Sequence, residues 1–176
     1  MIKQRTIKNS IRATGVGLHT GEKVYLTLHA AEPDSGIVFR RTDLAPMVSI
    51  MATPENVGDT NLHTTLVSGD TRISTIEHLM SALAGLGVDN LIVDVSAEEI
   101  PIMDGSSILF IEGIEKVGLV EQTADRDYLE LTENIPWEDV EKGIEFLAIP
   151  DKEYRITVMV DYKSPLLGTQ HANIYK

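Results

Sequence analysis

Glu77 and His78 are an adjacent pair of residues whose types could do chemistry together. A neutral histidine nitrogen can bind a metal ion, and a neighbouring carboxylate can take a proton from water bound to that metal. A catalytic zinc ion normally has three protein ligands, so His78 would need two partners. No H-E-x-x-H pattern supplies one, because Leu79, Met80 and Ser81 follow His78. The pair alone is a weak motif.

The pair lies at the start of a predicted amphipathic helix. Gly85 and Gly87 supply its end, and its apolar face consists of Ile76, Leu79, Met80, Leu83 and Ala84. With a step of 100° per residue, Glu77 falls at the edge of this face and His78 nearly opposite the core. A purely structural interpretation also fits: Ser74 as the N-cap, Glu77 completing a capping box, and His78 simply exposed.

Four further histidines occur at His19, His29, His63 and His171. None of them shows ligand spacing with His78. His19 lies in the glycine-rich segment 15–21, which fits either a plain hairpin turn or a close approach of the backbone to a ligand. His29 alternates with the apolar face of its strand, so we expect it to be exposed.

Alternating polarity over residues 23–30 predicts a half-buried strand, and residues 36–41 are expected to pair with it as a hairpin across 32–35. A second, weaker helical pattern covers residues 108–115, after the capping residues 104–106. Further strands are expected at residues 5–11, 62–67, 90–95, 128–132, 144–149 and 154–161. This order of elements indicates an α+β fold, a two-layer domain with helices on one face of a β-sheet.

A polar stretch at residues 121–127 separates two expected domains, 1–124 and 125–176. The second has roughly 50 residues and only a weak helical pattern, which is too little to bury a core of its own. The sequence therefore predicts one whole domain and the truncated start of a second.

The composition excludes several classes of protein. Absence of cysteine rules out disulfides and thiolate zinc sites and fits a reducing compartment, with the cytoplasm as the default. Acidic residues outnumber basic ones 27 to 15, which argues against a nucleic-acid partner. No apolar run approaches the roughly 20 residues of a transmembrane helix, and the N-terminus lacks a signal-peptide core. Neither a G-x-S-x-G elbow nor a nucleotide-binding glycine loop occurs.

Several longer segments carry a resemblance to a known family. They are residues 15–21 (GVGLHTG), 59–66 (DTNLHTTL), 74–79 (STIEHL) with 82–90 (ALAGLGVDN), and 99–106 (EIPIMDGS). In this order and at these distances from the N-terminus, they resemble the bacterial UDP-3-O-acyl-N-acetylglucosamine deacetylases. These are zinc enzymes that catalyse the committed step of lipid A synthesis.

The resemblance implies two similar domains, each a β-sheet with helices on one face, stacked so that the helices are sandwiched between the sheets. The site would lie between the domains, the second of which is incomplete here. It further implies a metal-dependent amide hydrolase in which His78 is the first zinc ligand and Glu77 the general base. Hydroxide would attack the acetamide carbonyl of the sugar, giving acetate and a free amine.

The same resemblance implies the substrate-binding residues. The backbone around Leu62 would line the cleft, and His19 belongs to a matching motif in a loop that can approach the substrate. Asp161 and Tyr162 would hold the uridine, Tyr162 by stacking. A hydrophobic passage, mainly from the second domain, would take the acyl chain of the UDP-linked amino sugar, which suits an enzyme working at the membrane surface.

The family's remaining zinc ligands, a histidine and an aspartate, correspond to positions beyond residue 176, as do its second catalytic histidine and a lysine. We therefore expect Zn²⁺ to be the cofactor of the parent protein and residues 1–176 alone to be inactive. Expected partners are the missing C-terminal part and a fused or separate acyl-carrier-protein dehydratase. The alternative is a non-catalytic binding or assembly module that retains the first-domain scaffold.

Overall fold

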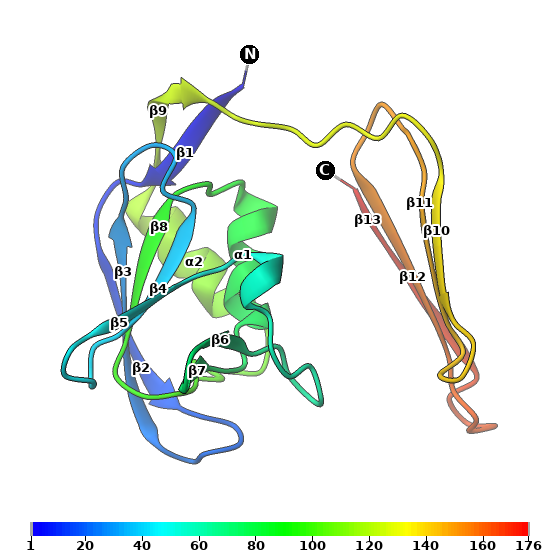
Figure 1. Ribbon diagram of the computed structural model, residues 1–176, viewed down its shortest axis with the longest axis horizontal. Coiled ribbons are helices and arrows are strands. Elements are labelled where there is room, and N and C mark those ends of the chain that lie inside the picture. Colours follow the sequence, from blue (N-terminus) through cyan, green and yellow to red (C-terminus); the bar gives the residue numbers. More distant parts are fainter. Residues whose placement is uncertain (1, 176) are drawn as a thin grey trace. The chain divides into compact units, whose positions relative to one another are not determined.

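The computed structural model describes residues 2–175, which form two compact units (Figure 1). The first unit ends at Arg126 and the second begins at Asp127. Strand β9 (Leu119–Asp125) runs through much of the polar stretch 121–127, so the chain leaves the first unit directly after a strand.

The first unit is built on a five-stranded mixed sheet. In spatial order its strands are β2 (Ile11–Val16), β3 (Lys23–Ala30), β8 (Leu91–Val95), β4 (Ile37–Arg41) and β5 (Val48–Met51). Neighbouring strands are antiparallel, except that β4 and β8 are parallel.

The strand predicted at residues 23–30 is confirmed as β3, but its expected hairpin with residues 36–41 is wrong. Strand β8 lies between β3 and β4 and pairs with both. The physical reason is burial, because Leu91, Val93 and Val95 of β8 are fully buried. A central place in the sheet suits this strongly apolar strand better than an edge.

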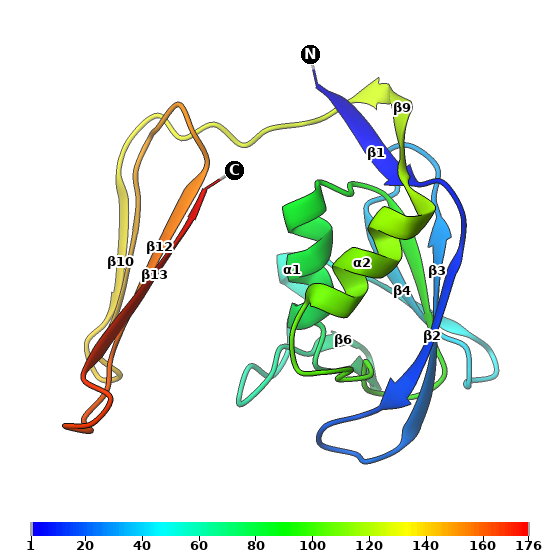
Figure 2. The same cartoon turned by 180° about the vertical axis from the view of Figure 1, so that it is seen from behind.

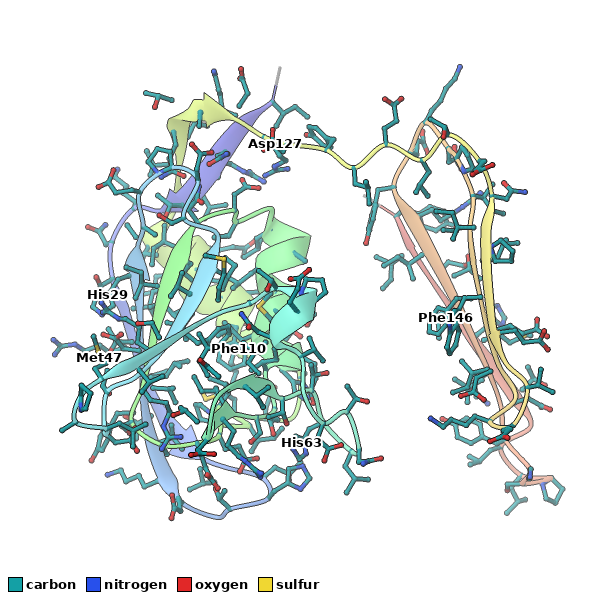
Figure 3. All side chains as sticks on the ribbon, in the orientation of Figure 1. His29, Met47, His63, Phe110, Asp127 and Phe146 are labelled. Carbon is teal, nitrogen blue, oxygen red and sulfur yellow. The ribbon has the colours of Figure 1, made fainter. Side chains whose placement is uncertain are left out.

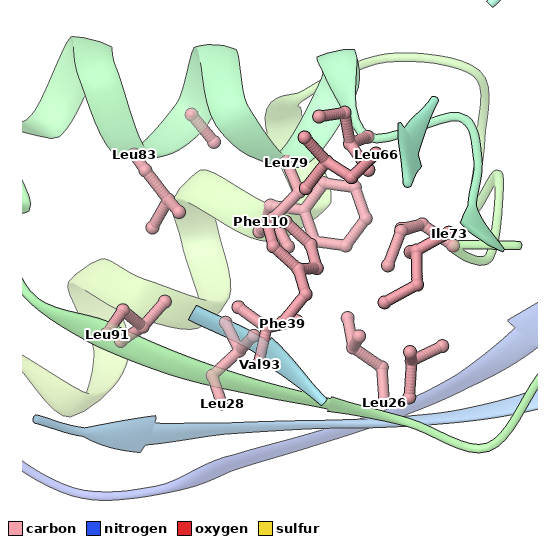
Figure 4. Close-up of a cluster of buried hydrophobic side chains, with 14 of the residues drawn as sticks. Leu26, Leu28, Phe39, Leu66, Ile73, Leu79, Leu83, Leu91, Val93 and Phe110 are labelled. Atoms are coloured by element: carbon pink, nitrogen blue, oxygen red, sulfur yellow. The ribbon is translucent and has the colours of Figure 1, made fainter. Parts of the chain in front are cut away.

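Helices α1 (Glu77–Leu86) and α2 (Ile108–Val117) lie side by side on one face of this sheet (Figure 2). Leu79, Leu83 and Phe110 pack from the helices toward Leu28 and Val93 of the sheet (Figure 4). The expected two-layer α+β architecture is therefore confirmed for this unit. Within residues 2–175, no helix is long and apolar enough to cross a membrane.

The end of α1 follows the sequence prediction only in part. Gly87 stops the helix in a left-handed conformation with φ of 67°, whereas Gly85 still lies inside it. The guanidinium group of Arg5 donates to the carbonyls of Leu86 and Gly87 at 2.6 and 3.1 Å. Arg126 donates to the Gly87 carbonyl at 2.9 Å, so cationic side chains satisfy the helix C-terminus.

Several shorter elements complete the first unit. They are β1 (Lys3–Ile7), which pairs with β9, the hairpin of β6 (Leu66–Ser68) and β7 (Thr71–Ile73), and the 3₁₀ helix η1 (Pro54–Asn56). The strand expected at 5–11 is thus shorter than predicted, because the chain turns between β1 and β2. Strands β5, β7, β9 and β10 have no counterpart in the sequence prediction, and β2 shares only Ile11 with a predicted strand.

Two other strand predictions are wrong in extent or existence. Residues 62–65 form a loop instead of a strand, since Asp59 accepts the Asn61 amide through its side chain and the Thr65 amide through its carbonyl. Residues 128–132 have no regular secondary structure, and the Leu129 side chain is 92% exposed. In the described chain, no neighbouring strand pairs with this segment.

The second unit consists of two antiparallel hairpins. They are β10 (Ile135–Asp139) with β11 (Ile144–Ala148), and β12 (Arg155–Asp161) with β13 (Thr169–Tyr175). Their large apolar side chains remain exposed: Trp137 is 53% exposed and Phe146 65%, although their rings lie 5.5 Å apart. Every side chain of the core cluster belongs to the first unit.

Candidate active site

The first turn of α1 is held by contacts from distant segments. The amide of Thr64 donates to Oε2 of Glu77 at 3.0 Å, and the amide of Ile76 donates to the carbonyl of Thr64 at 3.3 Å. The capping-box interpretation is wrong, because the Ser74 hydroxyl donates to the carbonyl of Glu98 at 3.1 Å. The helix begins at Glu77, so Ser74 lies too far ahead of the first turn to cap it.

Glu77 and His78 face each other at the surface of the first unit. Oε1 of Glu77 lies 4.0 Å from Nε2 of His78, and the side chains are 38% and 27% exposed, respectively. His78 therefore lies outside the buried face of α1, which contains Leu79, Ala82 and Leu83. Because Thr64 engages Oε2, the Glu77 carboxylate is oriented while Oε1 can accept a second donor.

Asp104 provides a second carboxylate, which interacts electrostatically with His78. The amide and hydroxyl of Ser106 donate to Asp104 at 3.0 and 2.9 Å. These hydrogen bonds hold the pKa of the Asp104 carboxyl below its ordinary value, and the charge of a protonated His78 adds a smaller attraction. The Ser81 and Ser107 hydroxyls, 2.6 Å apart, link the two helices nearby.

The loop between η1 and β6 carries Leu62 and His63. Leu62 has φ of 67° and is 90% exposed, so its backbone is displayed at the surface. His63 lies at the end of the first unit where β6 and β7 also lie (Figure 3). Its Nδ1 atom is buried without a hydrogen-bond partner, and its ring lies 4.6 Å from that of His19.

His19 belongs to the turn between β2 and β3. These strands do form a hairpin, so the plain structural interpretation of segment 15–21 is correct as far as the backbone is concerned. The same turn nevertheless places the His19 ring against His63, the neighbour of Thr64, whose amide holds Glu77. Three segments distant in sequence therefore meet around the start of α1.

An open, mainly apolar groove of about 460 Å³ adjoins the start of α1. It is lined by Ala52, Thr53, Pro54, Val57, Thr64, Leu66, Ile76, Glu77 and Met80. The Glu77 carboxylate consequently has apolar surface beside it as well as the polar groups of Thr64 and His78, and apolar surroundings strengthen electrostatic interactions.

Glu99 is a buried residue that the sequence interpretation did not single out. Its side chain is fully buried and accepts hydrogen bonds from the amides of His19 and Thr20 and from the hydroxyls of Thr20 and Thr75. Burial raises the pKa of Glu99, but the hydrogen bonds lower it by more, so the pKa lies below its ordinary value. Glu99 continues an alternation in which residues 91, 93 and 95 of β8 and then residue 97 are buried, and this alternation is the available sequence signal.

Acid should therefore destabilise the first unit through Glu99. Because the folded pKa is depressed, the stabilisation is complete above the ordinary value of 4.5 and is lost as the pH falls through the folded pKa. We expect Glu99→Gln to be less stable at pH 7 and to lose stability less steeply below about pH 4.5, as measured by urea unfolding midpoints. Equal acid slopes in wild type, Glu99→Gln and the exposed control Glu98→Gln would contradict this assignment.

Asp161 and Tyr162 belong to the second unit. Thr169 donates its hydroxyl to Asp161 at 2.9 Å, and the amide of Tyr162 donates to the carbonyl of Gly168 at 3.1 Å. Tyr162 is 45% exposed. The uridine-binding role of these two residues stays a prediction.

The residues around His78 fit a metal ion only in part. Among residues 2–175, no group of three histidine, cysteine, aspartate or glutamate side chains is arranged to hold a metal. His78 offers one imidazole nitrogen near the Glu77 carboxylate, which is one ligand and one base, but not a complete zinc site.

The sequence profile of the family described as UDP-3-O-acyl N-acetylglycosamine deacetylase matches residues 4–175. A UDP-3-O-acyl-N-acetylglucosamine deacetylase from Methylococcus capsulatus is 57% identical over 176 residues, which are 99% of this chain and 57% of the relative. The enzyme of that name from Teredinibacter turnerae is 55% identical over 166 residues, covering 94% of this chain and 54% of the relative.

The corresponding protein of Pseudomonas entomophila is 51% identical over 176 residues, 99% of this chain and 57% of the relative. The chain thus spans about half the length of the curated relatives it matches. The match to the family profile extends across both units, from β1 to β13. The chain belongs to the family of UDP-3-O-acyl N-acetylglycosamine deacetylases.

Proposed function

We propose that this chain is part of a zinc-dependent deacetylase acting on UDP-3-O-(3-hydroxyacyl)-N-acetylglucosamine. The products would be acetate and the free amine, at the committed step of lipid A synthesis. The observation that carries the proposal is the Glu77 carboxylate, oriented through Oε2 by the Thr64 amide and directing Oε1 toward Nε2 of His78 at 4.0 Å. The names of the relatives support the same reaction.

In this proposal His78 is one zinc ligand and Glu77 the general base. Zinc, when bound, lowers the pKa of a coordinated water to about 7 and so makes hydroxide accessible near neutral pH. Oε1 of Glu77 would accept the proton of this water. The Thr64 amide would keep the carboxylate in one orientation, because its hydrogen bond to Oε2 fixes the direction of that oxygen.

The remaining parts of the proposal concern the substrate and the partners. The exposed backbone at Leu62 and the ring of His19 would line the substrate cleft, and Asp161 with Tyr162 would hold the uridine. The two compact units would be the first deacetylase domain and the start of the second. The enzyme would work in the cytoplasm at the membrane surface, with the C-terminal part of the deacetylase and a fused or separate dehydratase as partners.

Residues 1–176 on their own should bind less than one equivalent of zinc and release no acetate from the UDP-sugar. The physical reason is that His78 alone cannot provide the three ligands of a catalytic zinc site. Zinc content by elemental analysis and acetate release, measured on one purified sample, would test both statements. Stoichiometric zinc, or turnover at a substantial fraction of the rate of an intact deacetylase, would contradict the prediction.

A non-catalytic binding or assembly module is the competing proposal. The incomplete ligand set among the described residues is the observation that favours it. The two proposals differ in the intact protein, because a module would bind the UDP-sugar without turnover even when loaded with zinc, whereas a deacetylase would release acetate.

A further inference from the structure

The carboxylate of Glu99 joins two segments that surround the candidate active site. Its oxygens accept the amide of His19 at 3.0 and 3.2 Å and the amide of Thr20 at 2.9 Å. They also accept the hydroxyl of Thr20 at 2.8 Å and that of Thr75 at 3.0 Å. Glu99 thus connects the β2–β3 turn to the residue that lies two positions before α1.

The surrounding backbone is shaped around this carboxylate. A Cβ atom at Gly17 would collide with the Thr20 hydroxyl and with the Glu99 carboxylate, so the turn needs glycine there. Thr75 adopts φ of 58°, which a β-branched residue adopts only when its surroundings impose it. The amides of His19 and Thr20 can only donate, and both threonine hydroxyls donate to Glu99 here, so the carboxylate accepts a hydrogen bond from each of these groups.

This arrangement has a consequence for the histidines. The amide of His19 is fixed by Glu99, and its ring packs at 4.6 Å against the ring of His63. His63 precedes Thr64, whose amide orients Glu77. A change in the position of the β2–β3 turn would therefore alter the packing of the His19 ring against the His63 ring.

We propose that Glu99 is a positioning residue, whose buried carboxylate holds the β2–β3 turn at a fixed distance from the start of α1 and thereby places His19 against His63. It touches neither the substrate nor the reacting atoms. The part of this inference that concerns substrate binding rests on the proposed function, because it takes His19 as a substrate-facing residue.

The first test measures amide hydrogen exchange by NMR in residues 1–176. We expect Glu99→Gln to accelerate exchange at the His19 and Thr20 amides by about tenfold or more, since glutamine offers one uncharged acceptor oxygen in place of the two carboxylate oxygens that these amides use. Amides of β8 should exchange as in wild type. The matched control is Glu98→Gln, which removes the neighbouring exposed carboxylate and should change neither set.

A milder variant keeps the test decisive if Glu99→Gln does not fold. Thr20→Val preserves the shape of the side chain and removes one of the hydroxyl donors to Glu99. It should accelerate exchange at the same two amides by a smaller factor. Equal acceleration throughout the sheet would show a general loss of stability and overturn the positioning role, as would unchanged exchange at His19 and Thr20.

The second test uses the intact zinc-loaded deacetylase that contains this chain. With Glu99→Gln, KM for the UDP-sugar should rise by about tenfold while kcat stays within about threefold, because a displaced His19 weakens binding without removing the base. A fall in kcat at unchanged KM would overturn the positioning role. If the wild-type enzyme releases no acetate, the proposed function fails, and the exchange experiment still decides whether Glu99 positions the turn.

Discussion

Replacing Glu77 with glutamine in the intact deacetylase that contains this chain should lower kcat by about 10²- to 10⁴-fold, the usual contribution of a general base. Glutamine has nearly the same shape and can still accept the Thr64 amide through its carbonyl oxygen, so the first turn of α1 should keep its structure. The Glu77→Gln variant loses the ability to take a proton from water, because an amide is not a base near neutral pH. Steady-state kinetics with the acylated UDP-sugar would measure the effect.

Two controls make this result specific to proton transfer. Zinc content of Glu77→Gln should equal that of the wild type, because Glu77 is proposed as the base and not as a ligand. Glu112→Gln, a charge-matched change on the exposed side of α2, should leave kcat unaltered. Retention of more than a tenth of the wild-type kcat by Glu77→Gln would rule out the assigned role.

The largest effect on stability should come from Leu79→Ala. Leu79 is completely buried between α1 and the sheet, one position after His78 (Figure 4). Removing such a side chain leaves a cavity and typically costs about 2–5 kcal/mol in the free energy of unfolding. Because whole domains are stable by only about 5–15 kcal/mol, much of the folded first unit would be lost at moderate urea concentrations.

Leu62→Ala is the matched control, since it makes the same chemical change at a side chain that is 90% exposed. It should alter the free energy of unfolding by no more than about 0.5 kcal/mol. Urea titrations followed by circular dichroism would compare the two variants. Similar unfolding midpoints for both would show that α1 does not depend on the packing described here.

The periodicity of apolar residues predicts those strands and helices in which one face is buried and the other is exposed. Residues 23–30 form β3 because alternate side chains enter the core, and the apolar stripe through Leu79 and Leu83 forms α1. The order of strands in a sheet depends on which distant strand pairs with each edge. The pairing of β8 with β4 therefore cannot be inferred from the sequence pattern of either strand alone. The loop at 62–65 was missed because its turn depends on hydrogen bonds of Asp59.

The candidate site was predictable to a different degree. Their residue types single out Glu77 and His78, and the resemblance implies their roles. The Thr64 amide that orients Glu77 has no side-chain signature, because any residue can provide a backbone N–H. Glu99 occupies a buried position in a recognisable alternation. Its hydrogen-bond donors Thr75 and His19 lie 24 and 80 residues away in the sequence, so only the folded structure shows which groups the carboxylate binds.

The pairing of β1 with β9 has a consequence for how the chain is made on the ribosome. β1 (Lys3–Ile7) is synthesised first, and its partner β9 (Leu119–Asp125) emerges only after both helices and the five-stranded sheet. At bacterial rates of translation this delay is on the order of 10 s. During that interval Ile7, which is fully buried in the finished unit, lacks its strand partner Leu119. The pairing of β1 with β9 can therefore form only after every other strand and helix of the first unit has been synthesised.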